Sequence, residues 1–298
     1  MALTVWSSAR YVFPLPAGHR FPVAKYALLR DAVIEAGLVP AERVLDPARA
    51  SRDDLLRVHT LGYVDRFSTG GMTDGEIRRL GFPWSPALVE RSLRAVGGTI
   101  AACERALVDG VSMNLAGGTH HAFADHGEGF CVFNDIAIAI RRLQAMQHVR
   151  RVAIIDLDVH QGNGTHAIFA HDSDVYTFSM HGGKNYPFHK VAGRLDIELD
   201  DGTADDAYLA RLAESLPVVL RDSSPDLVVF IAGADPHEGD ALGRLALTFA
   251  GLARRDAMVL DACRDVGLPV AITIGGGYGR RIEDTVAVHL NTVRIAGS

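Results

Sequence analysis

The sequence predicts a single α/β domain over residues 1–298, in which helices flank a central, mostly parallel β-sheet. Short segments rich in valine and isoleucine alternate with longer amphipathic segments along most of the chain. The clearest strand candidates are apolar on both faces, as strands of a covered parallel sheet are. No internal repeat, low-complexity tract or linker divides the chain, and 48% hydrophobic residues suffice for one large core.

Five strands are expected, the last of them with a weaker pattern: Arg151–Leu157, Val175–Met180, Asp226–Ala232, Pro269–Ile274 and Val111–Leu115. Four helices are expected at Pro86–Val108, Asp135–Gln147, Asp205–Leu220 and Arg254–Val266. Asn134 or Asp135 stands where the second helix needs its N-cap. Residues 1–80 lack a clear period, and we expect them to form helices and loops at the mouth of the functional site.

Composition excludes several function classes. A formal net charge of −6 argues against a protein that grips nucleic acid. We interpret the basic doublets as solvated helix faces or element ends: Arg78-Arg79, Arg141-Arg142, Arg150-Arg151, Arg254-Arg255 and Arg280-Arg281. Three cysteines without close spacing indicate a reduced protein without a disulfide framework. Neither a secretory signal nor a membrane span is recognisable, so we expect a cytoplasmic protein without a membrane partner.

Small residues and a polar or titratable group follow each predicted strand. The segments are Gly117-Gly118-Thr119-His120-His121, Asp158-Val159-His160, His181-Gly182-Gly183, Gly233-Ala234-Asp235 and Gly275-Gly276-Gly277-Tyr278. Because ligands of parallel α/β sheets bind beyond the carboxyl ends of the strands, these segments are expected to meet at one site.

A metal site is the strongest prediction from this convergence. Alternation along a strand places Asp156, Asp158 and His160 on one face, and burying three such groups is costly unless they are paired or bind a metal. An isolated Asp-x-His pair is more often a simple hydrogen bond, but Asp235 arrives from another strand as a third ligand. Asp158, His160 and Asp235 leave one position open, as catalytic zinc sites do.

Two further groups fit catalysis at such a metal. His120 and His121 can supply a general base and a general acid, although adjacent histidines are often surface residues. Tyr278 follows three glycines that allow close backbone approach, and its hydroxyl can donate to a developing oxyanion; otherwise it anchors a loop. His181 and His237 lie near the predicted site without an assigned role, and the remaining histidines are interpreted as structural.

These motifs resemble the zinc-dependent histone deacetylase and acetylpolyamine amidohydrolase superfamily, which has an arginase-like fold. Further shared motifs are Gly129-Phe130-Cys131, Asn134-Asp135, His160-Gln161-Gly162-Asn163-Gly164 and Glu238-Gly239-Asp240-Ala241-Leu242-Gly243, the last two similar to the class IV branch. The resemblance implies a zinc-dependent hydrolase, with Fe²⁺ as a possible substitute, that uses Asp158, His160 and Asp235 as ligands. It implies His121 as base and then acid, His120 as electrostatic partner, and Tyr278 as oxyanion donor.

The resemblance also assigns supporting residues. Asp156 holds His120, and Asn163 orients His121, where many members carry aspartate; the amide should lower the basicity of His121. Phe130, Tyr186 and Leu242 are expected to line the substrate channel. A structural K⁺ site is implied at Asp156, Asp158, His160, Ser179 and Met180. Asp74 and Glu76 are candidates for an acid that grips the substrate.

The expected function is therefore removal of an acyl group from an acylated amine, with an acyl-lysine side chain in a protein or peptide as the favoured substrate. An acetylated polyamine or another small acylated amine is the alternative. An arginase-like Mn²⁺ ureohydrolase is disfavoured, because Pro236-His237 follow Asp235 where further bridging carboxylates are needed. A non-catalytic acyl-lysine sensor is disfavoured by the presence of both histidines and Tyr278.

Overall fold

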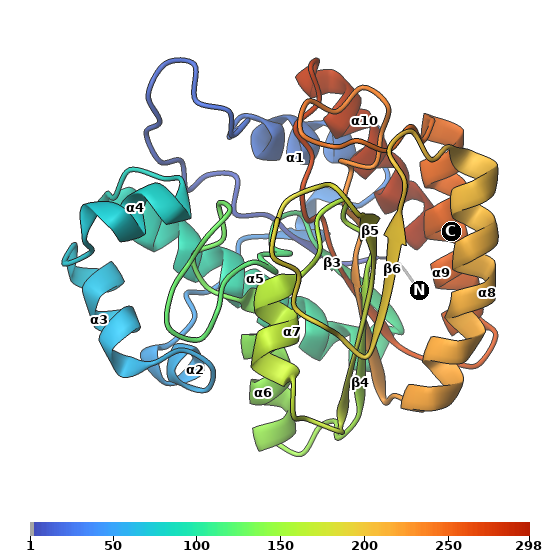
Figure 1. The fold of residues 1–298 in the computed structure, drawn as a ribbon, viewed down its shortest axis with the longest axis horizontal. Helices are drawn as coiled ribbons and strands as arrows, with labels where there is room; N and C mark the ends of the chain where they lie inside the picture. Colours follow the sequence, from blue (N-terminus) through green and yellow to red (C-terminus); the bar gives the residue numbers. More distant parts are fainter. Residues whose placement is uncertain (1–2) are drawn as a thin grey trace.

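The computed structural model describes residues 3–298; Met1 and Ala2 of the predicted 1–298 domain lie outside the described residues. One eight-stranded sheet runs through the molecule in the order β2-β1-β3-β8-β7-β4-β5-β6, and every registered pair is parallel (Figure 1). The strands are β1 (Val5–Trp6), β2 (Val44–Leu45), β3 (Val111–Asn114), β4 (Val152–Asp156), β5 (Val175–Gly182), β6 (Leu195–Leu199), β7 (Leu227–Ile231) and β8 (Val270–Thr273). The predicted sheet flanked by helices is thereby confirmed.

Helices cover both faces of this sheet. Figure 1 shows α6 and α7 on one side of the central strands and α8 and α9 on the other. The helices are α1 (Lys25–Glu35), η1 (Ala41–Arg43), α2 (Arg52–Leu56), α3 (Leu61–Thr69), α4 (Asp74–Leu80), α5 (Pro86–Asp109), α6 (Asp135–Ala145), α7 (Asn163–Phe169), α8 (Asp205–Ser223), α9 (Phe249–Arg264) and α10 (Ile282–Ala296). Within the described residues, no helix is long and apolar enough to cross a membrane.

Two hydrophobic cores lie on opposite faces of the sheet because side chains alternate along each strand. On β4, Ile155 packs into one core, which also contains side chains of α8, α9 and α10. Its neighbour Ile154 packs into the other core, with side chains of α3, α5 and α6. Strands with two covered faces read as continuous apolar runs, which is why the central strands were predictable.

The predicted elements are found within a few residues of their expected bounds, and Asn134 is the N-cap of α6, accepting a bond from Ala137 N at 3.0 Å. The expectation of only helices and loops before residue 80 was wrong. The two-residue strands β1 and β2 form one edge of the sheet, and they are too short to show a period. Strand β6 and helices α7 and α10 were also missed.

Candidate active site

Two carboxylates and one imidazole meet in the interior at the carboxyl ends of β4 and β7. His160 Nδ1 lies 2.9 Å from Asp158 Oδ1 and 3.2 Å from Asp235 Oδ2. All three side chains are buried, and their candidate ligand atoms lie within 4.8 Å of one another. Asp235 Oδ2 has no hydrogen-bond partner among the described residues. An orphaned carboxylate oxygen beside two other donors fits a divalent cation such as zinc.

Electrostatics at this cluster also favour a cation. Burial and the charge of Asp158 raise the pKa of Asp235 to about 7. Burial opposes protonation of His160, but Asp158 and Asp235 outweigh it and raise the pKa of His160 to about 10. The carboxylates therefore hold a proton on His160 when nothing else neutralises them. Binding of a metal replaces that proton, since a ligating imidazole must be neutral.

Backbone groups hold the two aspartates in place. Gly276 N donates to Asp158 Oδ2 at 2.6 Å, and Val159 N donates to Asp235 Oδ1 at 2.9 Å. A Cβ atom at residue 276 would stand 1.9 Å from Asp235 Oδ2, so only glycine allows this close approach. The glycine run predicted as a close-approach loop therefore packs directly against both carboxylates.

A buried arginine ties together the strands that carry the cluster. Arg255 Nη1 donates to the carbonyl of Gly233 at 2.6 Å and to that of Leu157 at 3.3 Å, and Asp256 pairs with the guanidinium at 2.7 Å. The interpretation of Arg254-Arg255 as a solvated doublet was wrong for Arg255, which is fully buried. A helical period that placed residue 255 on the inner face of α9 was the available signal.

The two adjacent histidines have different partners. His120 Nδ1 lies 2.7 Å from Asp156 Oδ2, the contact that the resemblance implied. Burial opposes a charge on His120, but Asp156 and Asp158 outweigh it and raise its pKa to about 9. The rings of His120 and His121 are 4.1 Å apart between centroids. His120 is therefore the charged member of the pair at neutral pH.

His121 ends a hydrogen-bonded chain of three side chains. Its Nδ1 lies 2.7 Å from Asn163 Oδ1, and Asn163 Nδ2 donates to Glu128 Oε1 over 2.7 Å. Burial, together with the charges of His120 and His160, holds the pKa of His121 well below its usual range. His121 is thus neutral at neutral pH, with a proton on Nδ1 and a free lone pair on Nε2.

Tyr278 reaches the site from the glycine loop that follows β8. Its backbone N donates to Asp240 Oδ2 at 2.6 Å, and Asp240 Oδ1 accepts from Leu242 N and Gly243 N, each at 2.8 Å. The Tyr278 ring lies 6.4 Å from that of His160 between centroids. Burial and the charges of Asp235 and Asp158 raise the pKa of Tyr278 well above its usual range. The hydroxyl therefore stays protonated and able to donate.

A pocket of about 860 Å³ opens above these groups. Among its lining residues are His121, His160 and Tyr278 at the base and the three predicted channel residues, Phe130, Tyr186 and Leu242. Tyr186 stands edge-on to His121, with 4.9 Å between ring centroids. Neither Asp74 nor Glu76 lines the pocket; Glu76 instead pairs with Arg66 at 2.7 Å and caps α4.

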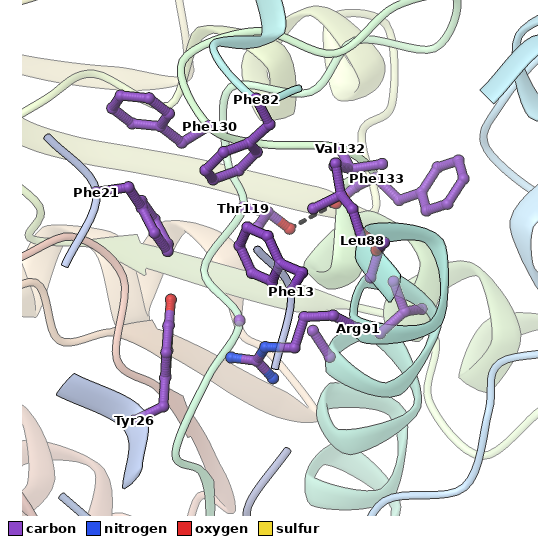
Figure 2. Close-up of a pocket in the computed structure, with 14 residues that line it drawn as sticks. Phe13, Phe21, Tyr26, Phe82, Leu88, Arg91, Thr119, Phe130, Val132 and Phe133 are labelled. Carbon is purple, nitrogen blue, oxygen red and sulfur yellow. Dashed lines mark hydrogen bonds between the residues drawn. The ribbon is translucent and has the colours of Figure 1, made fainter. Parts of the chain in front are cut away.

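Phe130 lines both this pocket and a second, smaller cavity of about 60 Å³. Figure 2 shows aromatic side chains, among them Phe13, Phe21 and Phe82, around one side of it and Arg91 on the other. Phe130 adopts a φ of 67°, which a bulky side chain seldom does. The strained backbone is held by the bond from Phe130 N to the carbonyl of Leu80 at 2.8 Å.

Comparison with known proteins places this geometry in a family. A model of the histone deacetylase domain matches residues 19–293. The chain belongs to the histone deacetylase family. It is 34% identical to histone deacetylase 2 of Arabidopsis thaliana, over 90% of this chain and 72% of the relative. It is 47% identical to an uncharacterised protein of Picosynechococcus sp., over 94% of this chain and 93% of that protein.

Solved structures agree. A crystal structure of a histone deacetylase homologue complexed with SAHA aligns with all of this chain and 84% of its own, with a TM-score of 0.87 at 25% identity. The resemblance in sequence and the arginase/deacetylase-like fold are both confirmed. As a family member, the protein is a hydrolase of the deacetylase and amidohydrolase kind, acting on amides. Histone deacetylases of this kind are generally zinc-dependent, which the buried Asp-His-Asp cluster fits.

The five residues predicted as K⁺ ligands lie on, or just after, β4 and β5. Asp156 and Ser179 are direct partners in the register of these strands, and Met180 follows. Ser179 Oγ lies 2.9 Å from His181 Nδ1. The assignment of Asp156, Asp158, His160, Ser179 and Met180 as K⁺ ligands stays a prediction.

Three acidic residues organise this histone deacetylase site although the sequence assigned none of them a role there; Asp135 and Asp240 were known only as parts of shared motifs. Glu128 ends the chain behind His121, Asp240 fixes the Tyr278 loop, and Asp135 accepts from Thr119 N at 2.8 Å and Gly118 N at 3.1 Å. The last contact holds the turn that carries His120. Glu128 and Asp240 are acidic residues beside glycines in predicted loops, which was the available signal, whereas Asp135 begins a predicted helix.

Proposed function

We propose that this histone deacetylase family member is a zinc-dependent deacylase that removes an acyl group from a lysine side chain. The buried cluster of Asp158, His160 and Asp235, beside the two histidines and Tyr278 at the base of an open pocket, is the observation that carries the proposal. These three residues hold the metal. When bound, zinc supplies a Lewis acid for the amide carbonyl and for the attacking water.

His121 moves the proton in this proposal. Its Nε2 accepts a proton from the attacking water, and the same proton passes to the departing amine. The lowered pKa keeps the imidazole neutral before reaction, as a base must be, and makes the imidazolium a ready acid afterwards. His120, held in its charged form by Asp156 and Asp158, adds a positive charge where negative charge develops on the substrate.

Tyr278 stabilises the oxyanion in this proposal, and the pocket walls bind the aliphatic chain of the substrate. The protonated Tyr278 hydroxyl donates to the oxyanion as the carbonyl carbon becomes tetrahedral. Phe130, Tyr186 and Leu242 line the pocket and present apolar surface to the aliphatic lysine chain. K⁺ at the ends of β4 and β5 is part of the proposal, as a fixed charge that supports the metal-ligand strand.

The test is a deacylation assay on lysine peptides whose acyl chains increase in length, with and without a chelator. An acetylated polyamine belongs in the same panel, because amidohydrolases of this superfamily include enzymes for that class. Turnover that is lost on chelation and returns with Zn²⁺ supports the proposal. If only the polyamine is turned over, the substrate is a small acylated amine and not an acyl-lysine. Absence of turnover by folded, zinc-loaded protein contradicts the proposed chemistry.

A further inference from the structure

Basic side chains surround the mouth of the active-site pocket. Five of its lining residues are cationic, and all five are exposed: Arg20, Arg78, Arg79, Lys184 and Arg244. No aspartate or glutamate is among the lining residues. The whole chain carries a formal net charge of −6, so this positive rim runs against the average of the molecule. We use the term basic rim for these five residues.

The basic rim is assembled from four separate parts of the chain. Arg20 precedes α1, Arg78 and Arg79 stand in the last turn of α4, Lys184 follows β5, and Arg244 follows β7. The helix dipole of α4 accounts for basic residues in its last turn. It does not account for basic residues at the same pocket on three unrelated loops. The gathering of basic residues from all four segments is therefore associated with the pocket they share, and not with the helix dipole of α4.

Little of this charge is neutralised by the protein. Arg244 Nη1 lies 3.1 Å from Asp201 Oδ2, and Lys184 Nζ lies 3.9 Å from the same oxygen. One carboxylate thus serves two cations. In the described part of the chain, Arg20, Arg78 and Arg79 form no ion pair. The rim keeps a substantial positive charge after these pairs are counted.

Hydrogen bonds fix the backbone of the rim. His19 Nε2 contacts the carbonyl of Gly81 at 2.9 Å, which joins the loop of Arg20 to the end of α4. Gly129 N donates to the carbonyl of Arg79 at 3.3 Å, which joins α4 to the Phe130 loop. Asn185 Nδ2 donates to the carbonyl of Leu242 at 2.8 Å, which joins the Lys184 and Arg244 loops. The loops and the helix end that carry the positive charges are therefore held to one another by hydrogen bonds.

We propose that the basic rim selects amides whose surroundings are anionic, namely acyl-lysine side chains flanked by aspartate or glutamate. This inference rests on the proposed deacylase function and names its substrate class. Carboxylates one or two residues from an acyl-lysine bound in the pocket would stand at its mouth, near the basic rim, and charges interact there over roughly 8 Å at physiological salt. Phe188, 82% exposed at the same mouth, adds apolar surface for a peptide. A cationic polyamine meets like charge there and is disfavoured.

The experiment compares three peptides that share one central acyl-lysine and differ in flanking residues: acidic, neutral or basic. A small acylated amine that carries two carboxylates and an acetylated polyamine complete the panel. At low salt we expect kcat/KM for the acidic peptide to exceed that for the basic one by on the order of ten-fold or more, as electrostatic steering gives. The ratio should shrink towards one at high salt, since screening removes it.

Charge reversal identifies the rim as the cause. Arg78→Glu with Arg79→Glu should lower kcat/KM for the acidic peptide and raise it for the basic peptide. The matched control is Arg211→Glu with Arg221→Glu, which makes the same change of net charge at exposed positions on α8. That control should keep the parent preference. A preference shifted equally by both double variants would reflect net charge alone and would overturn the assignment to the rim.

The outcomes separate the two proposals. Equal rates for acidic and basic peptides, or faster turnover of the basic one, overturn the rim proposal and leave the deacylase intact. If the dicarboxylate amine is turned over faster than any peptide, the basic rim still selects anionic substrates, but the preferred substrate is a small molecule and not a peptide. If no amide is turned over, the deacylase proposal fails. Fluorescence anisotropy of the labelled acidic and basic peptides then tests the rim, which requires tighter, salt-sensitive binding of the acidic one.

Discussion

Asn163 donates its side-chain amide to Glu128 over 2.7 Å, and this contact determines which atom Asn163 presents to His121. With Nδ2 committed to the carboxylate, Oδ1 faces His121 Nδ1 at 2.7 Å. An amide oxygen can only accept, so His121 carries its proton on Nδ1 and keeps Nε2 free as a base. The superfamily often places aspartate at this position. Here the carboxylate stands one side chain further away, on Glu128.

Loss of Glu128 should release this orientation. Glu128→Ala leaves Asn163 free to turn its amide, which would place a proton on Nε2 of His121. We expect kcat to fall about 10-fold, a part of the 10²–10⁴-fold that general acid–base catalysis contributes. Glu128→Gln is the control, because its side-chain oxygen still accepts from Asn163, and it should keep most of the rate. Steady-state kinetics of the two variants test this prediction. An equal loss of kcat in both would mean that Glu128 acts through its charge and not by orienting Asn163.

Moving the carboxylate next to His121 should change its basicity. In Asn163→Asp combined with Glu128→Gln, the glutamine amide donates to an aspartate that now contacts His121 Nδ1. A neighbouring carboxylate stabilises imidazolium and raises the pKa of histidine. The acid limb of the kcat/KM profile should move to higher pH than in the parent. An unchanged limb would mean that another group controls it.

The parent enzyme should remain active in mildly acidic solution. The base form of His121 is lost as pH falls through its pKa, and burial with the charges of His120 and His160 holds that pKa well below the usual value of 6.5. A metal at His160 replaces the proton with charge of the same sign, so the direction is kept. The acid limb of kcat/KM should therefore lie below pH 6.5. A limb above pH 7 in a pH–rate profile would contradict this.

Removal of the Tyr278 hydroxyl should impair chemistry without affecting metal binding. Tyr278→Phe deletes a donor whose pKa keeps it protonated throughout the neutral range. Loss of one oxyanion donor typically costs about 10²–10³-fold in kcat. The loop itself is held through the backbone bond from Tyr278 N to Asp240, which phenylalanine preserves. Kinetics and zinc analysis of the same preparation test this; a rate equal to that of the parent would remove Tyr278 from the mechanism.

Metal should stabilise the fold through the Asp-His-Asp cluster. At a free zinc concentration 100 times Kd, binding adds about 2.7 kcal/mol to the free energy of unfolding, which corresponds to a rise in Tm of several degrees. Asp158→Asn, which keeps the shape of the side chain, should reduce this rise and the bound zinc. Asp261→Ala, at an exposed carboxylate on α9 paired with Arg264, is the control. Stoichiometric zinc in Asp158→Asn with the full rise in Tm would overturn the ligand assignment.

Elements buried on both faces were predictable from sequence, and elements at the edges were not. Strands such as Leu227–Ile231 are uniformly apolar because two cores contact them. Val5–Trp6 and Val44–Leu45 each contribute two residues to the sheet, fewer than any periodicity test needs. Their place in the sheet is determined by long-range pairing, of β1 with β3 and of β2 with β1, which local sequence does not encode.

At the site, the candidate metal ligands, the two histidines and their direct partners Asp156 and Asn163 were predicted, whereas Glu128 and Asp240 were not given a role. Asp158 and Asp235 follow strands directly, so the topology of a parallel sheet brings them together. Glu128 and Asp240 lie in loops whose path depends on long-range contacts, and no rule of spacing links either to its partner. The resemblance predicted Asp156 beside His120, but the carboxylate behind Asn163 became visible only in three dimensions.

The loops that carry the basic rim are joined by hydrogen bonds from the backbone of Gly129 and the side chains of His19 and Asn185. Of the rim side chains, only Arg244 and Lys184 pair with a protein carboxylate, that of the exposed residue Asp201. Substitutions at the rim positions can therefore accumulate over evolution without disturbing the catalytic interior. Descendants of one ancestral enzyme could in this way exchange acidic, neutral and basic substrates while inheriting the same reaction. Selectivity and chemistry evolve as separable traits in such an arrangement.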